Sequence, residues 1–273
     1  VNKPWETSGF EKLLTDIERL PTSLAFAPWE RDLLGAIPKF LLNYSRYRDW
    51  FERETLADLA MVIGRQFRSL EEADAAAMRA IAKRFWGSEL GADFSTYDGK
   101  ALAATKIQDR QHAKESLILC DFNWPIMYSE ATVDNVGDPT LESQICSAVT
   151  GKEIDEEGLY RIGERVFNLQ RAILIREGWR GRADDTLDEY EFSSPLTGAA
   201  DFGNPEVLIP GEDGRTISRK NLTIDRREFE RMKDEFYDLR GWDIKTGLQK
   251  KSTLEELDLA DVAGTMEAGG FLA

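Results

Sequence analysis

The chain has 273 residues, 42% of them hydrophobic, which is enough for one large domain or two smaller ones. Its 35 basic and 50 acidic residues give a net charge of −15, which disfavours nucleic acid as a partner because phosphate backbones are also negative. No apolar run reaches the roughly 20 residues of a membrane-spanning helix. Two cysteines and one histidine exclude a disulfide framework and a zinc site made from those residue types alone. The absence of a signal-peptide pattern leads us to expect a cytoplasmic protein.

Helical periodicity dominates the N-terminal part of the sequence. Apolar residues at helical spacing predict helices over residues 11–20 and 55–67. Ser69, with a glutamate three residues later, has the pattern of a capping box and predicts a helix that ends near Gly87. A longer helix, rich in alanine, glutamine and lysine, is predicted over residues 99–119.

The helix with the clearest sequence pattern runs from Asp155 to Glu177. Asp155 is expected to cap its N-terminus, with Ile154 and Leu159 packed together as a hydrophobic staple. Gly178 is placed to end it. One apolar stripe is expected to face the core, and it comprises Leu159, Ile162, Val166, Leu169, Ile173 and Leu174.

The C-terminal third begins with a segment rich in glycine and proline. Residues 193–225 are predicted to form a long irregular loop, with a short hairpin that turns at residues 212–214. Helical spacing returns over residues 225–239. A last short helix is predicted over residues 252–257, with Ser252 as its N-cap.

These elements predict an all-α fold, an irregular multi-helix domain with two lobes. No strand pattern is strong enough to build a sheet. We divide the chain into an N-terminal helical segment, residues 1–98, and a helical domain, residues 99–273.

Few residues offer catalytic chemistry. The sequence has neither of the glycine-rich phosphate-binding motifs, so nucleotide binding of those kinds is not supported. His112 is the one possible histidine base, and an exposed position on its helix is the favoured interpretation over a catalytic role. Spacing alone favours Cys120 and Cys146 as small buried hydrophobic residues, although Cys120, at the end of an apolar helix, could also offer a thiolate to a metal cluster.

Four segments, in the same order, resemble motifs of the aldehyde ferredoxin oxidoreductase family. Residues 115–120 (ESLILC) resemble its Asp-Ser-Leu-Gly-Leu-Cys segment. Residues 160–171 (YRIGERVFNLQR) are similar to its helix of the form IGERxxNxxR. Residues 182–187 (RADDTL) resemble its RxDDTLP turn, and residues 236–247 (FYDLRGWDIKTG) resemble its YYxLRGWDxxTG segment.

The resemblance implies two cofactors, a tungsten (or molybdenum) bis-pterin and a [4Fe-4S] cluster. It implies that Cys120 is one cluster ligand and that Glu115 and Leu119 contact the pterin. Glu115 stands where the family has Asp, and Ile118 stands where it has Gly. The family's other three cluster cysteines and its N-terminal pterin-binding portion have no counterpart in this sequence. Both cofactors are therefore expected to need residues outside it.

The function implied by the resemblance is that of the C-terminal part of an enzyme that oxidises an aldehyde to a carboxylic acid. Electrons would leave through the [4Fe-4S] cluster to ferredoxin or an electron-transfer subunit. The chain alone is expected to be inactive, and a homo-oligomer remains open. One alternative is an aromatic acyl-thioester reductase of the same family, suggested by Phe122, Trp124 and Tyr128. The other is a cofactor-free helical scaffold or interaction protein.

Two further expectations concern particular residues. Cys120, and not Cys146, is expected to be the functional cysteine, because only Cys120 lies in a matched segment. Residues 240–243 are expected to be structural, with a buried Trp242 and with Arg240 or Asp243 in a polar contact that fixes the C-terminal chain. Gly241 is expected to have a backbone conformation that suits no side chain.

Overall fold

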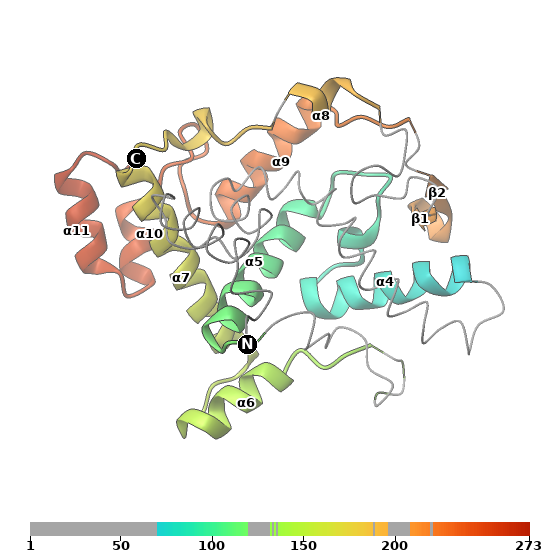
Figure 1. The fold of residues 1–273 in the computed structure, drawn as a ribbon, viewed down its shortest axis with the longest axis horizontal. Helices are drawn as coiled ribbons and strands as arrows, with labels where there is room; N and C mark the ends of the chain where they lie inside the picture. The colour runs from blue at the N-terminus through green and yellow to red at the C-terminus, as the bar shows by residue number, and fades with distance from the viewer. Residues whose placement is uncertain are drawn as a thin grey trace, which may run out of the picture.

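Helices form most of the part of the chain that the computed structural model describes, which comprises residues 70–119, 132, 134, 136–187, 189–195, 208–218 and 221–273. They are connected by short turns and irregular segments (Figure 1). These helices are α4 (Leu70–Trp86), α5 (Lys100–Ser116), α6 (Leu141–Thr150), α7 (Glu156–Arg176), α8 (Glu189–Ser193), α9 (Arg226–Leu239), α10 (Lys251–Glu256) and α11 (Ala260–Ala268).

The predicted all-α class is confirmed, and a single small hairpin accompanies the helices in the described ranges. Strand β1 (Leu208–Pro210) pairs antiparallel with β2 (Thr216–Ser218). A 3-10 turn over Glu212–Gly214 joins them, as predicted for this loop. Within the same ranges, no helix is both long enough and apolar enough to cross a membrane.

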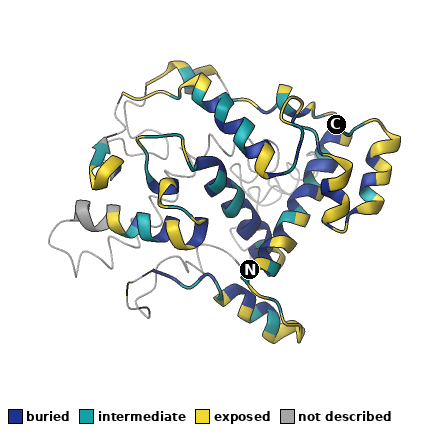
Figure 2. Ribbon diagram, turned by 180° about the vertical axis from the view of Figure 1, so that it is seen from behind, coloured by how far each residue is buried: buried dark blue, intermediate teal, exposed yellow. Residues whose placement is uncertain are grey.

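Helix α5 lies at the centre of the fold and contacts α4, α7 and α9. Figure 2 shows it as one of the most buried elements. Small side chains such as Ala101, Ala104 and Ala113 let its neighbours approach closely. The closest approach is at Gly163 of α7, where a Cβ atom would lie 1.8 Å from the backbone oxygen of Asp109. A glycine at this position is therefore required for α7 to pack against α5.

Two hydrophobic clusters stabilise the arrangement. The main one is built by α4, α5, α7 and α9 and by the segment after α9; its largest members are Phe85, Trp86, Phe167, Phe229, Phe236, Tyr237 and Trp242. The second joins the C-terminal half of α7 to α10 and α11, and comprises Ala172, Ile175, Leu254, Leu257, Leu259, Ala263 and Met266.

The sequence signal for the start of α7 is confirmed, and the structure shows a similar cap at the start of α9. The Asp155 carboxylate accepts a hydrogen bond from the backbone N–H of Gly158 at 2.8 Å, which caps α7. Ile154 and Leu159 lie in one cluster, as a hydrophobic staple requires. Asp225 caps α9 by accepting from the backbone N–H groups of Arg227 and Glu228.

The predicted apolar stripe of α7 describes its buried face only in part, because Leu159 is buried whereas two other members are exposed. Ile162 and Leu169 are exposed, at 39% and 37% of their surface. The residues that α7 buries instead include Gly163, Asn168 and Arg171. Periodicity counts only apolar residues, whereas this helix buries polar side chains that have partners and a glycine that permits close contact.

Other differences concern helix ends and short helices. Helix α10 begins at Lys251 with Lys250 as its N-cap residue, so Ser252 does not cap it. Helices α8 and α11 were not predicted, because they are short and have weak apolar periodicity. The predicted helices over residues 11–20 and 55–67, and the capping residue Ser69, lie outside the described residues.

Candidate functional site

The segment that carries the predicted cofactor contacts begins where α5 ends. The helix stops at Ser116, three residues earlier than predicted, because the chain turns there. The backbone N–H of Leu119 donates to the oxygen of Lys114 at 3.1 Å, and Ile118 between them has φ +60°. This is the pattern of a Schellman turn. Cys120 follows directly but lies outside the described residues.

Ile118 occupies a position in this turn that usually suits glycine. A β-branched side chain with positive φ is strained, because its Cβ crowds the neighbouring backbone. The side chain is 93% exposed, so packing does not offset the strain. The turn therefore has the left-handed backbone conformation although its residue is β-branched.

The strain predicts that Ile118→Gly stabilises the chain by about 1 kcal/mol, since relief of strain outweighs the added freedom of the unfolded state. Ile118→Ala is the control, because alanine keeps the strain and the exposed side chain loses no packing. Chemical denaturation of the two variants and the parent chain measures the effect. A glycine variant no more stable than the alanine variant would contradict the strain at this position.

Glu115 is held by side chains from its own helix. Gln111 Nε2 donates to Glu115 Oε1 at 2.8 Å, a contact between residues one turn apart. His112 Nδ1 lies 3.8 Å from Glu115 Oε2. The Glu115 side chain remains 35% exposed, whereas Gln111 and His112 are buried. The carboxylate therefore lies at the border between the buried helix and solvent.

His112 is buried, so the interpretation as an exposed helix residue is wrong. It is 4% exposed, and its ring lies 5.4 Å from that of Phe167. Burial, followed by the nearby charge of Arg240, lowers the pKa of His112 to about 3. The imidazole is therefore neutral at physiological pH, and its Nδ1 has no hydrogen-bond partner. The sequence did not indicate this burial, because α5 has few large apolar residues.

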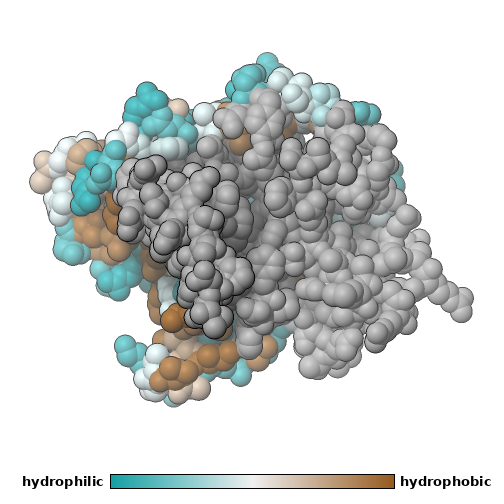
Figure 3. Space-filling model, viewed as in Figure 1, coloured by the Kyte–Doolittle hydropathy of each residue, from teal (hydrophilic) through white to brown (hydrophobic). Residues whose placement is uncertain are grey.

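The structure places Cys146 as predicted, on α6 in a small apolar cluster with Ala113 and Leu159. A buried pair connects α6 to α5, since Arg110 donates to both carboxylate oxygens of Glu142 at 3.0 and 2.7 Å. Figure 3 shows apolar surface over α6. Among the residues that the structure describes, no group of three or more His, Cys, Asp or Glu is arranged to hold a metal ion.

The other segments named in the sequence analysis meet in a buried polar network. Arg171 of α7 donates from Nη1 and Nη2 to the two oxygens of Asp185 at 2.8 and 2.6 Å. The same carboxylate accepts from Trp179 Nε1 at 2.8 Å and from Tyr237 Oη at 2.6 Å. Burial and the Asp185 charge raise the pKa of Tyr237 far above its usual range, so the phenol stays protonated as a donor.

A second part of the network surrounds Trp242, which has no exposed surface. Its Nε1 donates to Asn168 Oδ1 at 2.9 Å, and Gln249 Nε2 donates to the same oxygen at 2.7 Å. Gly241, with φ +65°, precedes it. The predictions of a buried Trp242 and of a glycine-specific conformation are both confirmed.

Arg240 joins this network to α5. Its Nη1 donates to Asp109 at 2.6 Å and its Nη2 to Gln108 at 2.9 Å, so the predicted polar contact of Arg240 is confirmed. Burial raises the pKa of Asp109 to about 6, although the charge of Arg240 opposes the rise. The matched segments therefore contribute mainly to holding α5, α7 and α9 together.

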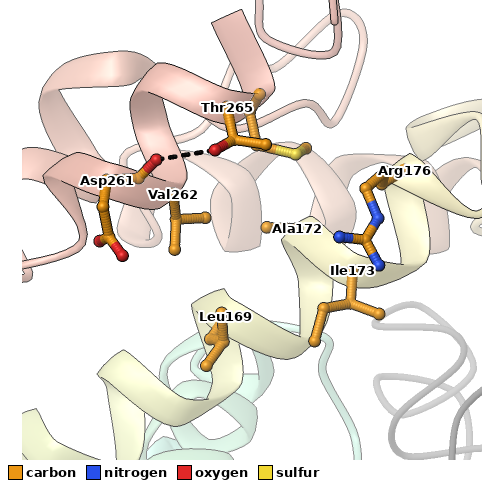
Figure 4. A pocket seen from close by; sticks show the side chains of 8 residues that line it. Leu169, Ala172, Ile173, Arg176, Asp261, Val262 and Thr265 are labelled. Carbon is orange, nitrogen blue, oxygen red and sulfur yellow. Dashed lines mark hydrogen bonds between the residues drawn. The ribbon is translucent and has the colours of Figure 1, made fainter.

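A groove between α7 and α11 is separate from these residues. It has a volume of about 190 Å³. Leu169, Ile173 and Val262 line it, with Arg176 and Asp261 also at its edge (Figure 4). The lining is largely apolar and contains none of the residues that the resemblance assigns to a cofactor.

Comparison with known families matches residues 66–259 to the family described as aldehyde ferredoxin oxidoreductase, domains 2 and 3. The described elements are thus the helical domains of an oxidoreductase family. The chain belongs to the aldehyde ferredoxin oxidoreductase family, since the match covers 194 of its 273 residues. Tungsten–pterin and iron–sulfur cofactors are generally associated with this family.

Proposed function

We propose that this chain is the C-terminal helical part of a tungsten- or molybdenum-pterin oxidoreductase. The reaction is oxidation of an aldehyde with water to a carboxylic acid, which releases two electrons and two protons. The electrons leave singly through a [4Fe-4S] cluster to ferredoxin or an electron-transfer subunit. The observation that carries the proposal is the family match over residues 66–259, which includes the turn at the end of α5 that precedes Cys120.

The residues at the end of α5 fit a pterin contact. A pterin carries N–H donors, and the partly exposed carboxylate of Glu115 is an acceptor for them. Leu119 contributes backbone groups in the turn that follows. In this proposal the chain orients the pterin from one side, and the buried, neutral His112 adds no positive charge beside the carboxylate.

The described residues do not fit a complete [4Fe-4S] site. Such a cluster is usually held by four thiolates, and the chain has two cysteines, of which Cys146 is packed in an apolar cluster. Cys120 would supply one thiolate, and the other three would come from outside the 273 residues. The polypeptide that brings them would lie against the end of α5, where the exposed Ile118 is available for contact.

The two cofactors supply the electron chemistry when bound, because the metal accepts the electron pair and the cluster passes the electrons on. This chain's contribution is to bind and orient. In this proposal Glu115 accepts a hydrogen bond, Cys120 offers a thiolate, and the contacts of Arg240 with Asp109 and Gln108 hold α5 in place.

The test compares Cys120→Ala with Cys146→Ala in the holoenzyme, purified anaerobically from its native source or host. We expect Cys120→Ala to lose or degrade the cluster signal in electron paramagnetic resonance, while Cys146→Ala retains it. Equal effects of the two substitutions would overturn the assignment of Cys120. Absence of tungsten, molybdenum and iron from the parent protein would favour the cofactor-free scaffold.

A further inference from the structure

Glu115 has one methylene more than the aspartate of the family motif, and its own helix compensates for the extra length. A longer side chain has more rotamers, so an unrestrained Glu115 carboxylate would occupy a wider range of positions. The hydrogen bond from Gln111 Nε2 to Glu115 Oε1, at 2.8 Å, removes much of that freedom. It folds the side chain back along α5 by one helical turn.

The surroundings restrict the carboxylate further. His112 lies on the adjacent position of the same helix turn, with Nδ1 at 3.8 Å from Oε2 of Glu115. The imidazole is buried and rests near the ring of Phe167, so it cannot move away easily. Gln111 is buried as well, which fixes its amide in place.

We propose that Gln111 is a positioning residue that places the longer carboxylate of Glu115 for a hydrogen bond to the pterin, with the buried His112 as the wall beside it. This inference rests on the proposed function, since it requires that a pterin binds at the end of α5. Gln111 itself does not touch the cofactor in this arrangement. It acts through Glu115.

A purely structural role of Gln111 makes a different prediction. A glutamine–glutamate pair one turn apart stabilises an isolated helix only weakly. Its loss would then slightly destabilise the fold but would leave the pterin bound. The positioning role instead predicts that the effect of Gln111 on pterin binding depends on which residue occupies position 115.

The experiment is a double-mutant cycle in the anaerobically purified holoenzyme, with Gln111→Leu, Glu115→Asp and the double variant. Pterin bound per polypeptide is measured by fluorescence after oxidative release, and thermal unfolding is recorded for each protein. We expect Gln111→Leu to lower pterin retention about tenfold when residue 115 is Glu, as for loss of a hydrogen bond to a charged group. We expect the double variant to retain about as much pterin as Glu115→Asp alone, because the shorter carboxylate does not need to be folded back.

Gln144→Leu is the matched control, because Gln144 of α6 also donates from Nε2 to a side chain one helical turn away, that of the N-cap residue Thr140. It should leave pterin content unchanged. Full pterin retention in Gln111→Leu, or an equal loss in both backgrounds, would overturn the positioning role while the proposed function stands. A parent protein without pterin would overturn the proposed function and this inference together.

Discussion

Replacing Asp185 by alanine should lower the free energy of unfolding by about 3–5 kcal/mol, because it leaves a buried charge without its partner. Arg171 and Asp185 are both almost fully buried, and the guanidinium is bound through two parallel hydrogen bonds. Trp179 and Tyr237 would lose an acceptor in the same variant. Chemical denaturation followed by circular dichroism measures the change.

Asp184 provides the matched control for this substitution. It is the neighbouring residue and also pairs with an arginine, Arg180, but that arginine is largely exposed. Asp184→Ala should therefore cost less than about 1 kcal/mol, as is usual for exposed ion pairs. A double variant with Arg171→Met should be more stable than the sum of the two single changes, because no buried charge remains. Equal costs for Asp184→Ala and Asp185→Ala would refute the central role of Asp185.

Trp242→Ala should cost about 3–5 kcal/mol, as for other large truncations in a core. The indole lies 6.0 Å from the ring of Phe167 and 6.1 Å from that of Phe236, and the guanidinium of Arg171 lies 4.9 Å from its centroid. Its removal would leave a cavity and uncover a buried charge. Denaturant melts of the same chain are the measurement.

Trp242→Phe separates packing from hydrogen bonding. Asn168 Oδ1 still accepts from Gln249 when the indole N–H is lost, so this variant should be clearly more stable than Trp242→Ala. Leu239→Ala is the control, because Leu239 is exposed on α9 and its truncation should change the stability by no more than about 0.5 kcal/mol. If Trp242→Ala and Leu239→Ala were equally stable, the indole would not be part of the core.

Sequence patterns predicted the elements whose ends carry a local signal. Asp155 caps α7 through a contact with a residue three positions away, so its role could be predicted without knowledge of the fold. The hairpin turn over Glu212–Gly214 is local in the same sense. Each of these features depends on short-range chemistry alone.

What the sequence could not predict depends on contacts between distant residues. The burial of His112 follows from the packing of α5 among its neighbours, and the polar face of α7 is buried because Arg171 and Asn168 meet partners from other segments. The Gln111–Glu115 pair did have a local signal, the spacing of four residues, but many exposed helices share that spacing. The place of Cys120 relative to these groups stays a prediction.

Several residues of the family motifs have structural roles that restrict which amino acid can occupy their positions, and for this reason the motifs can be recognised from sequence alone. Gly163, Asn168 and Arg171 come from one matched segment, and Trp242 from another. All four are buried. Gly163 permits the close approach of α7 to α5, and Asn168 is the acceptor shared by Trp242 and Gln249. Arg171 binds the carboxylate of Asp185, and Trp242 lies in the core. Their side chains cannot be exchanged without changing those contacts, whereas Glu115 and Ile118, at the end of α5, differ from the motif.

Two of the buried titratable groups of α5, His112 and Asp109, make opposite contributions to proton linkage. The pKa of His112 falls from 6.5 to about 3 on folding, so below pH 6.5 the unfolded chain binds a proton that the folded chain does not, and stability declines. The pKa of Asp109 rises from 3.8 to about 6, so between those values the folded chain binds the extra proton, and stability increases. Between about pH 4 and 6 the two effects offset each other, and Asp109→Asn should reveal the histidine slope of about 1.4 kcal/mol per pH unit in urea melts. His112 and Asp109 of the same helix together keep the free energy of unfolding nearly constant in mild acid.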